Sequence, residues 1–225
     1  RGLGDVYKRQ RVANGMPNPQ QDDYKAMSAP NVQEKSTDSP LRWMMASEVA
    51  FLRAEGAMRG WTAEMGGTAE EFYNKGIELS FLENGLSADA AARYAADETS
   101  KPTDFTDVSA ANTKYNISAL GKITIKWNAG ASEEEQLERI ITQKWIAMFP
   151  NGTEAWSEFR RTGYPLIFPV RSNYPTSGVD TNKQIRRMVF PQSEYSNNGA
   201  AVQEAVKLLG GPDNGGTKLW WDKKN

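Results

Sequence analysis

The side chains that most often perform chemistry in proteins are missing from this sequence. The chain of 225 residues contains no cysteine and no histidine, which excludes thiol nucleophiles, serine–histidine–aspartate triads and zinc sites built from imidazole or thiolate. A pair of carboxylates remains, as glycoside hydrolases use. Glu154 and Glu158 are one example of such a pair. Residues four apart on a helix face the same way, however, and cannot flank a substrate from opposite sides. The sequence therefore predicts a binding protein and no enzyme.

The charge and hydropathy of the chain narrow the choice of partners. It has 27 basic and 28 acidic residues, a net charge of -1. That is too little positive charge to hold nucleic acid. No apolar run reaches the roughly 18 residues that a membrane-spanning helix needs. Attachment to a membrane would therefore depend on a part of the protein outside this sequence.

The seven tryptophans of the chain are the obvious candidates for ligand contacts, because aromatic faces pack against sugars. Trp127 lies in a long polar segment, residues 97–130, and long loops inside compact domains are often functional. We therefore predict Trp127 as the ligand-binding residue. Trp145 and Trp156 fall on helical apolar stripes instead, so we expect both in the core.

Other polar clusters have structural explanations. Arg160 and Arg161 are expected to pair with carboxylates and helix-end carbonyls, and Glu133–Glu135 is expected at the positive N-terminus of a helix. In Gly211–Lys218 the lysine follows the threonine and a helix precedes the segment, which argues against a phosphate-binding loop. Asp213–Gly215 could bind calcium through oxygens, but turn chemistry explains it without an ion. We predict no metal and no cofactor.

Two helical hairpins are expected to position these residues, at about residues 41–85 and 132–162. Each contains a capping box, which begins at Thr68 in the first hairpin and at Ser132 in the second. Thr153 is expected to cap the last helix of the second hairpin. The predicted fold is all-α, with tetratricopeptide-like helical hairpins joined by long irregular loops.

Weaker signals lie between and after the hairpins. Residues 88–96 and 202–209 predict short helices, and residues 123–127 and 188–190 predict extended pieces. The adjacent pair Trp220–Trp221 is expected to dock the tail against the body. None of these segments alone indicates a function.

The N-terminal part of the chain differs in character from the rest. Residues 1–10 lack apolar periodicity and begin with arginine, so we interpret them as a segment foreign to the domain, similar to translated adapter sequence. Residues 11–40 are predicted to be a loop that leads into the domain. The domain itself is expected to occupy residues 41–225.

Four segments that occur in order carry a family resemblance. They are MASEVAFLRAEG (Met45–Gly56), YNKGIELSF (Tyr73–Phe81), QKWIAMFPNGTEAWSEFRRTGYP (Gln143–Pro165) and RRMVFPQSEYSNN (Arg186–Asn198). Together they resemble the SusD/RagB family of nutrient-binding outer-membrane lipoproteins. The resemblance covers roughly residues 35–225 and looks like the C-terminal part of such a protein.

The resemblance implies a surface-exposed, lipid-anchored protein of a Bacteroidetes-type outer membrane. It implies a SusC-like TonB-dependent barrel as partner and an oligosaccharide or a peptide as ligand. The lipidated cysteine and the family's N-terminal half are absent from this sequence, so the anchor and part of the binding site are expected in a missing N-terminal region. Two alternatives stay open: a tetratricopeptide-like scaffold that binds only proteins, and a carboxylate-dependent glycoside hydrolase.

Overall fold

The computed structural model describes residues 43–107, 113, 116–169 and 178–224, and within them it is helical. The described residues form no strand, and their one isolated β-bridge is antiparallel and joins Phe105 to Ile117. The predicted all-α class is therefore confirmed. The helices are α2 (Ala46–Met58), α3 (Thr62–Met65), α4 (Ala69–Glu83), α5 (Ala88–Ala95), α6 (Glu133–Ala147), α7 (Gly152–Thr162) and α8 (Gln192–Leu208).

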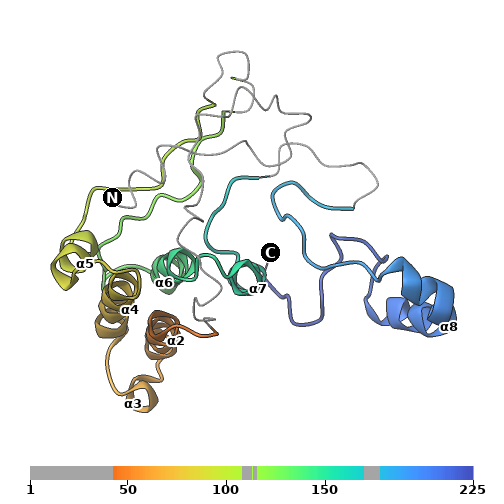
Figure 1. The fold of residues 1–225 in the computed structure, drawn as a ribbon, viewed down its shortest axis with the longest axis horizontal. Coiled ribbons are helices and arrows are strands. Elements are labelled where there is room, and N and C mark those ends of the chain that lie inside the picture. The colour runs from red at the N-terminus through yellow and green to blue at the C-terminus, as the bar shows by residue number, and fades with distance from the viewer. Residues whose placement is uncertain (1–42, 108–112, 114–115, 170–177, 225) are drawn as a thin grey trace. The chain divides into compact units, whose positions relative to one another are not determined.

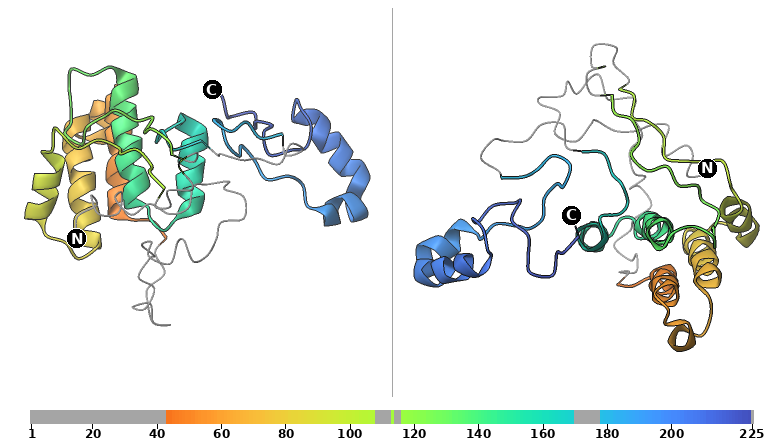
Figure 2. Two further views of the ribbon diagram at one scale, coloured as in Figure 1. Left: turned by 90° about the horizontal axis from the view of Figure 1, so that it is seen from above. Right: turned by 180° about the vertical axis from the view of Figure 1, so that it is seen from behind.

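The chain divides into two compact units, and one of them contains most of the helices. This helical unit consists of Ala29–Pro102 and Leu120–Leu166. Within it, α2, α4 and α6 pack side by side, α5 lies against α4, and α7 lies against α6 (Figures 1 and 2). The expectations for residues 1–10 and 11–40 fall on residues outside the described ranges and stay predictions.

The core of the helical unit lies where α2 meets α4. Phe51 of α2 is 1% exposed and Tyr73 of α4 is fully buried. The two helices approach closely because Gly76 has no side chain: a β-carbon added there would lie 2.7 Å from the Phe51 ring. The first predicted hairpin is thus present, and a glycine–phenylalanine contact sets the spacing of its helices.

Local signals at the helix ends were mostly predictive. Both capping boxes are present, at Thr68 with α4 and at Ser132 with α6. The cap of α7 differs from the prediction, because the capping residue is Asn151 and not Thr153: Asn151 Oδ1 accepts the backbone N–H of Glu154. Asparagine is at least as good an N-cap as threonine, so Asn151 can begin the helix two residues before Thr153.

The second compact unit contains α8, which is longer than predicted. It begins at Gln192 and not near residue 202, and it bends at Asn198, where the backbone leaves helical geometry. Val202 is its one buried residue. The first turns of α8 carry no apolar stripe, so periodicity could not reveal them. No described helix combines the length and the apolar character that spanning a bilayer requires.

Ion pairs hold the C-terminal tail. Arg186 binds Asp222 with distances of 2.7 Å and 2.5 Å, and both side chains are buried. Arg187 pairs with Asp213 in the same unit. Trp220 is 82% exposed, so the expected docking role is wrong for this residue, whereas its neighbour Trp221 is half-buried. The residues predicted as extended pieces form no strand in the described part of the chain.

Three further tryptophans are exposed, and one of them, Trp145, was expected in the core. Trp43 is 85% exposed, Trp61 56% and Trp145 38%. Trp156 is half-buried, and the Arg160 guanidinium lies 3.6 Å from the centre of its ring. Periodicity shows which residues share a helix face, but it does not show whether a neighbour covers that face.

The exposure of Trp145 lowers the expected cost of removing it. Trp145→Ala should reduce the free energy of unfolding by less than about 3 kcal/mol, below the range for fully buried aromatic residues. Urea unfolding at equilibrium measures this value. A loss of about 3–5 kcal/mol would contradict it and would show that the ring is covered in solution.

Candidate functional site

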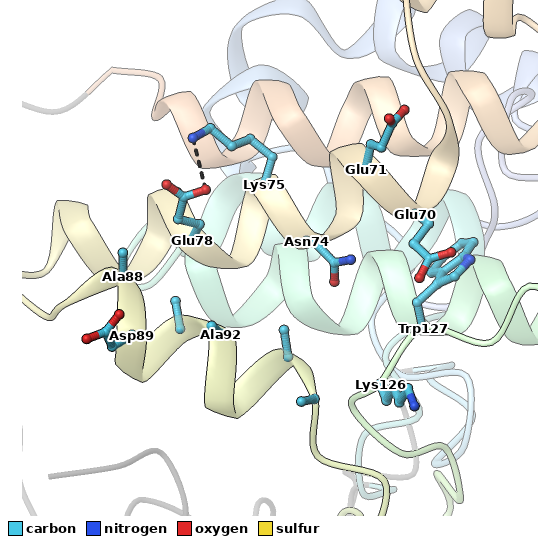
Figure 3. Close-up of a pocket in the computed structure, with 13 residues that line it drawn as sticks. Glu70, Glu71, Asn74, Lys75, Glu78, Ala88, Asp89, Ala92, Lys126 and Trp127 are labelled. Carbon is cyan, nitrogen blue, oxygen red and sulfur yellow. Dashed lines mark hydrogen bonds and ion pairs between the residues drawn. The ribbon is translucent and has the colours of Figure 1, made fainter.

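A groove in the helical unit is the candidate binding site. It lies between α4 and α5, is closed at one end by Lys126 and Trp127, and has a volume of about 760 Å³ (Figure 3). The wall formed by α4 is polar and the wall formed by α5 is mostly alanine. The lining residues are Glu70, Glu71, Asn74, Lys75, Glu78, Ala88, Asp89, Ala91, Ala92, Ala95, Ala96, Lys126 and Trp127.

The sequence forms this groove through helix spacing. Glu70, Asn74 and Glu78 are four residues apart on α4, so they share one face of the helix. Opposite them, the residues of α5 that line the groove are alanines except for Asp89, and the short alanine side chains leave open space above that helix. Ser87 fixes the start of α5 by accepting the backbone N–H of Ala90. Figure 3 shows Asn74 projecting from α4 towards α5.

Both lysines of the groove are already paired. Lys75 Nζ lies 2.9 Å from Glu78 Oε2. Lys126 pairs with Glu98, and the hydrogen bond to that carboxylate raises the pKa of Lys126. Among the described residues, the side chains of Asn74 and Asp89 have no hydrogen-bond partner. The groove therefore offers an amide and a carboxylate to a ligand, together with a slightly negative field.

Trp127 lies at this groove but not as an open platform. Its side chain is 7% exposed and belongs to the core of the helical unit. The indole packs on the Tyr73 ring at a centroid distance of 5.1 Å, and the Tyr73 hydroxyl donates to the Ile125 carbonyl at 2.5 Å. These contacts attach the predicted loop to α4. A direct role of Trp127 in ligand binding stays a prediction.

The two carboxylates considered for catalysis form ion pairs with a buried lysine. Glu154 and Glu158 both lie next to the ammonium group of Lys144, at 3.4 Å and 3.2 Å. Arg161 forks onto Glu55 and Glu158, which confirms the pairing expected for that arginine. The two glutamates approach one lysine from the same helix, so this geometry does not enclose a substrate.

The remaining polar clusters agree with their structural explanations. Glu133–Glu135 occupies the first turn of α6. Asn214 Oδ1 accepts the backbone N–H groups of Gly216 and Thr217, which is turn chemistry. No group of three or more acidic side chains in the described part of the chain is arranged to hold a metal ion.

Sequence reasoning missed the groove itself. The polar face of α4 and the alanines of α5 were both visible as patterns, but nothing local shows that these two faces oppose each other. A polar face with four-residue spacing that precedes an alanine-rich helix was the available signal.

Comparisons with known proteins agree with this architecture. A model of the SusD-like family, described as SusD and RagB outer membrane lipoprotein, matches residues 5–222. That match extends further towards the N-terminus than residues 35–225, over which the sequence motifs carried the resemblance. No curated protein matches the chain.

Several solved structures resemble this chain in both sequence and fold. A chitin-binding SusD homologue from Flavobacterium johnsoniae is 48% identical, with a TM-score of 0.75 over 81% of this chain and 37% of its own. A SusD homologue from Bacteroides uniformis is 49% identical, with a TM-score of 0.74 over 85% of this chain and 39% of its own. A SusD-like protein from Bacteroides thetaiotaomicron is 47% identical, with a TM-score of 0.75 over 83% of this chain and 38% of its own.

The chain thus spans about two fifths of the length of these relatives, between 37% and 39%. The family model nevertheless covers nearly all of this sequence, and the helical architecture is that of the solved homologues. The chain belongs to the SusD-like family.

Proposed function

We propose that the protein is the glycan-binding surface component of a TonB-dependent uptake system in the outer membrane. The observation that carries this proposal is its 48% identity, over 81% of the chain, to a SusD homologue that binds chitin. The family's description as outer membrane lipoproteins supports the location. A SusC-like barrel would receive the ligand, and a lipid anchor would attach the protein to the membrane.

The chemistry of the groove supports a neutral or amine-bearing glycan. Amide and carboxylate side chains, here Asn74, Asp89 and Glu70, accept hydrogen bonds from sugar hydroxyls and amides. Because both lysines are paired, a polyanionic glycan would meet more negative than positive charge. We therefore include the groove, with Trp127 at its closed end, as one contact region for the ligand.

The proposed role is capture without turnover. Glu154 and Glu158 are engaged with Lys144, and the chain has no histidine or cysteine to supply a general base or a nucleophile at neutral pH. A protein that only hands its ligand to a transporter needs a shaped surface with a few polar contacts.

The test is a binding assay on the full-length protein. The ligands for isothermal titration calorimetry are N-acetylglucosamine oligomers, cello-oligosaccharides, oligogalacturonate and a peptide panel. The protein should bind the N-acetylglucosamine oligomers and should not bind the polyanionic oligogalacturonate. No new reducing ends should appear during incubation. Peptide binding without glycan binding would overturn the ligand class, and turnover in proportion to protein would overturn the non-catalytic role. Association with protein partners alone would favour the scaffold alternative.

Variants locate the contact region. Asn74→Ala and Asp89→Ala should each weaken glycan binding, because each removes a side chain that has no other described partner. Trp127→Phe keeps an aromatic ring in the core and tests the predicted indole contact. Glu204→Gln, on the exposed face of α8, is the matched control. Unchanged affinity in all three groove variants would exclude the groove while leaving the family function intact.

A further inference from the structure

A partly buried group of charged side chains connects α2, α6 and α7. Lys144 of α6 lies at its centre, with a side chain that is 1% exposed. The Lys144 ammonium nitrogen lies 3.2 Å from Glu158 Oε1 and 3.4 Å from Glu154 Oε1, both on α7. Glu48 of α2 provides a third carboxylate at 3.9 Å. One buried cation thus faces three carboxylates from two helices.

The charged contacts continue along α7 to the end of α2. Arg161 Nη2 lies 2.6 Å from Glu55 Oε2 and 2.7 Å from Glu158 Oε2. Glu55 also accepts a hydrogen bond from Arg59 at 2.8 Å. We call the following seven side chains the Lys144 cluster: Glu48, Glu55, Arg59, Lys144, Glu154, Glu158 and Arg161.

Charged contacts, and not only apolar packing, attach α7 to the helical unit. The buried core of the described helical unit includes residues of α2, α4, α5 and α6 together with Trp127, but none of α7. Ala155 and Phe159 of α7 are buried outside that core. The attachment of α7 should therefore respond to the charge state of the cluster more than the rest of the unit does.

The charges of the cluster do not balance. Its four carboxylates carry -4 and its three cations +3, so the ionised cluster has a net charge of -1 (3 − 4). Glu48 is the carboxylate farthest from Lys144 and lies beyond hydrogen-bonding distance. Burial raises the pKa of Glu48; Lys144 opposes this rise, and the carboxylates of Glu154 and Glu158 add to it.

We propose that the Lys144 cluster binds one proton at Glu48 in weakly acidic solution, and that this proton strengthens the attachment of α7 to α2 and α6. Neutral Glu48 no longer repels Glu154 and Glu158, and Lys144 is left to pair with those two carboxylates. Three negative charges then face three positive ones. The device is built into the fold and is independent of the glycan-binding role.

Lowering the pH affects the attachment of α7 in opposite directions through Glu48 and Glu55. The pKa of Glu48 lies above its ordinary value of 4.5. Its proton therefore stabilises the attached state of α7, fully so below pH 4.5, and this contribution is lost as the pH rises through the raised pKa. Burial also disfavours the charge of Glu55, yet hydrogen bonds from Arg161 and Arg59 hold its pKa below 4.5. Its contribution is present above 4.5 and is lost as the pH falls through the lowered pKa.

Other polar groups also lie near Glu48 at the start of α2. On α4, Glu83 accepts hydrogen bonds from the backbone N–H and the hydroxyl of Ser47, at 3.0 Å and 2.6 Å. A hydrogen bond from the Met45 backbone lowers the pKa of Glu48, but burial, which is the largest cause, raises it. The attachment of α7 should therefore be strongest in weakly acidic solution and weaker on either side.

Amide hydrogen exchange on the full chain tests the proposal. Protection factors, corrected for the intrinsic pH dependence of exchange, are measured for α7 between pH 7 and pH 5, with α4 as an internal reference. Protection of α7 should rise as the pH falls, by up to about tenfold for each unit by which the pKa of Glu48 is raised. Protection of α4 should stay constant.

Glu48→Gln provides the decisive comparison, because it fixes the neutral form with nearly the same shape. This variant should show high α7 protection already at pH 7 and no rise towards pH 5. Glu64→Gln, which removes an exposed carboxylate on α3, should behave like the wild type. An equal rise in Glu48→Gln and wild type, or no rise in wild type, would overturn the proposal.

Discussion

Replacing Tyr73 with alanine is expected to lower the free energy of unfolding by about 3–5 kcal/mol, as full removal of a buried aromatic ring does. Tyr73 is fully buried and lies between two other rings. The centroid of Phe51 is 6.2 Å away in an edge-on arrangement, and that of Trp127 is 5.1 Å away. Removing the middle ring would leave a cavity that helices held this closely cannot easily fill.

Equilibrium urea unfolding of the full chain measures the loss. Tyr73→Phe is the matched control, because it keeps the ring and removes only the hydroxyl that donates to the Ile125 carbonyl at 2.5 Å. That variant should lose about 1–2 kcal/mol. A Tyr73→Ala midpoint close to that of the wild type would show that α2 and α4 do not pack as described.

Replacing Lys144 with methionine is expected to have an effect of similar size, about 3–5 kcal/mol, because it removes the cation from a buried ion cluster. Methionine preserves most of the volume of the side chain, so the loss reports charge and not a cavity. Glu48, Glu154 and Glu158 would face one another without a common partner. The loss should be smaller at pH 5 than at pH 7, because protonation neutralises Glu48, whose pKa burial already raises.

Lys75→Met serves as the control for charge removal. Lys75 also pairs with a glutamate, at 2.9 Å, but its side chain is 50% exposed. Exposed pairs of this kind contribute less than about 1 kcal/mol. Equal losses in Lys144→Met and Lys75→Met would mean that the Lys144 cluster is as well hydrated as the protein surface.

The parts of the fold that the sequence predicted are those set by neighbouring residues. Thr68 and Ser132 begin helices because their hydroxyls reach the backbone three residues later, and such signals are readable in a short window. The contact between Arg161 and Glu55 joins residues 106 positions apart. Residue types alone do not specify such a pairing, so the cluster around Lys144 could not be predicted.

The candidate site shows the same division. Its residues could be assigned to elements in advance, since the alanine-rich helix and the loop that contains Trp127 were both expected. The polar sequence around Trp127 suggested an exposed side chain. The residue is buried because it packs on Tyr73 of α4, which is distant in the sequence. For Trp145 the prediction failed in the opposite way: it was expected in the core but is exposed, because no described neighbour fully covers its face of the helix.

The chain leaves the helical unit after Pro102 and returns to it at Leu120. A β-carbon placed on Gly121 would lie 3.2 Å from Pro102 Cγ, so the points of exit and return are adjacent. The cost of closing a loop rises only slowly with its length. The intervening residues can therefore lengthen, shorten or change sequence with little effect on the packing of α2, α4 and α6. Between Pro102 and Gly121, related proteins are free to diverge without rebuilding the helical unit.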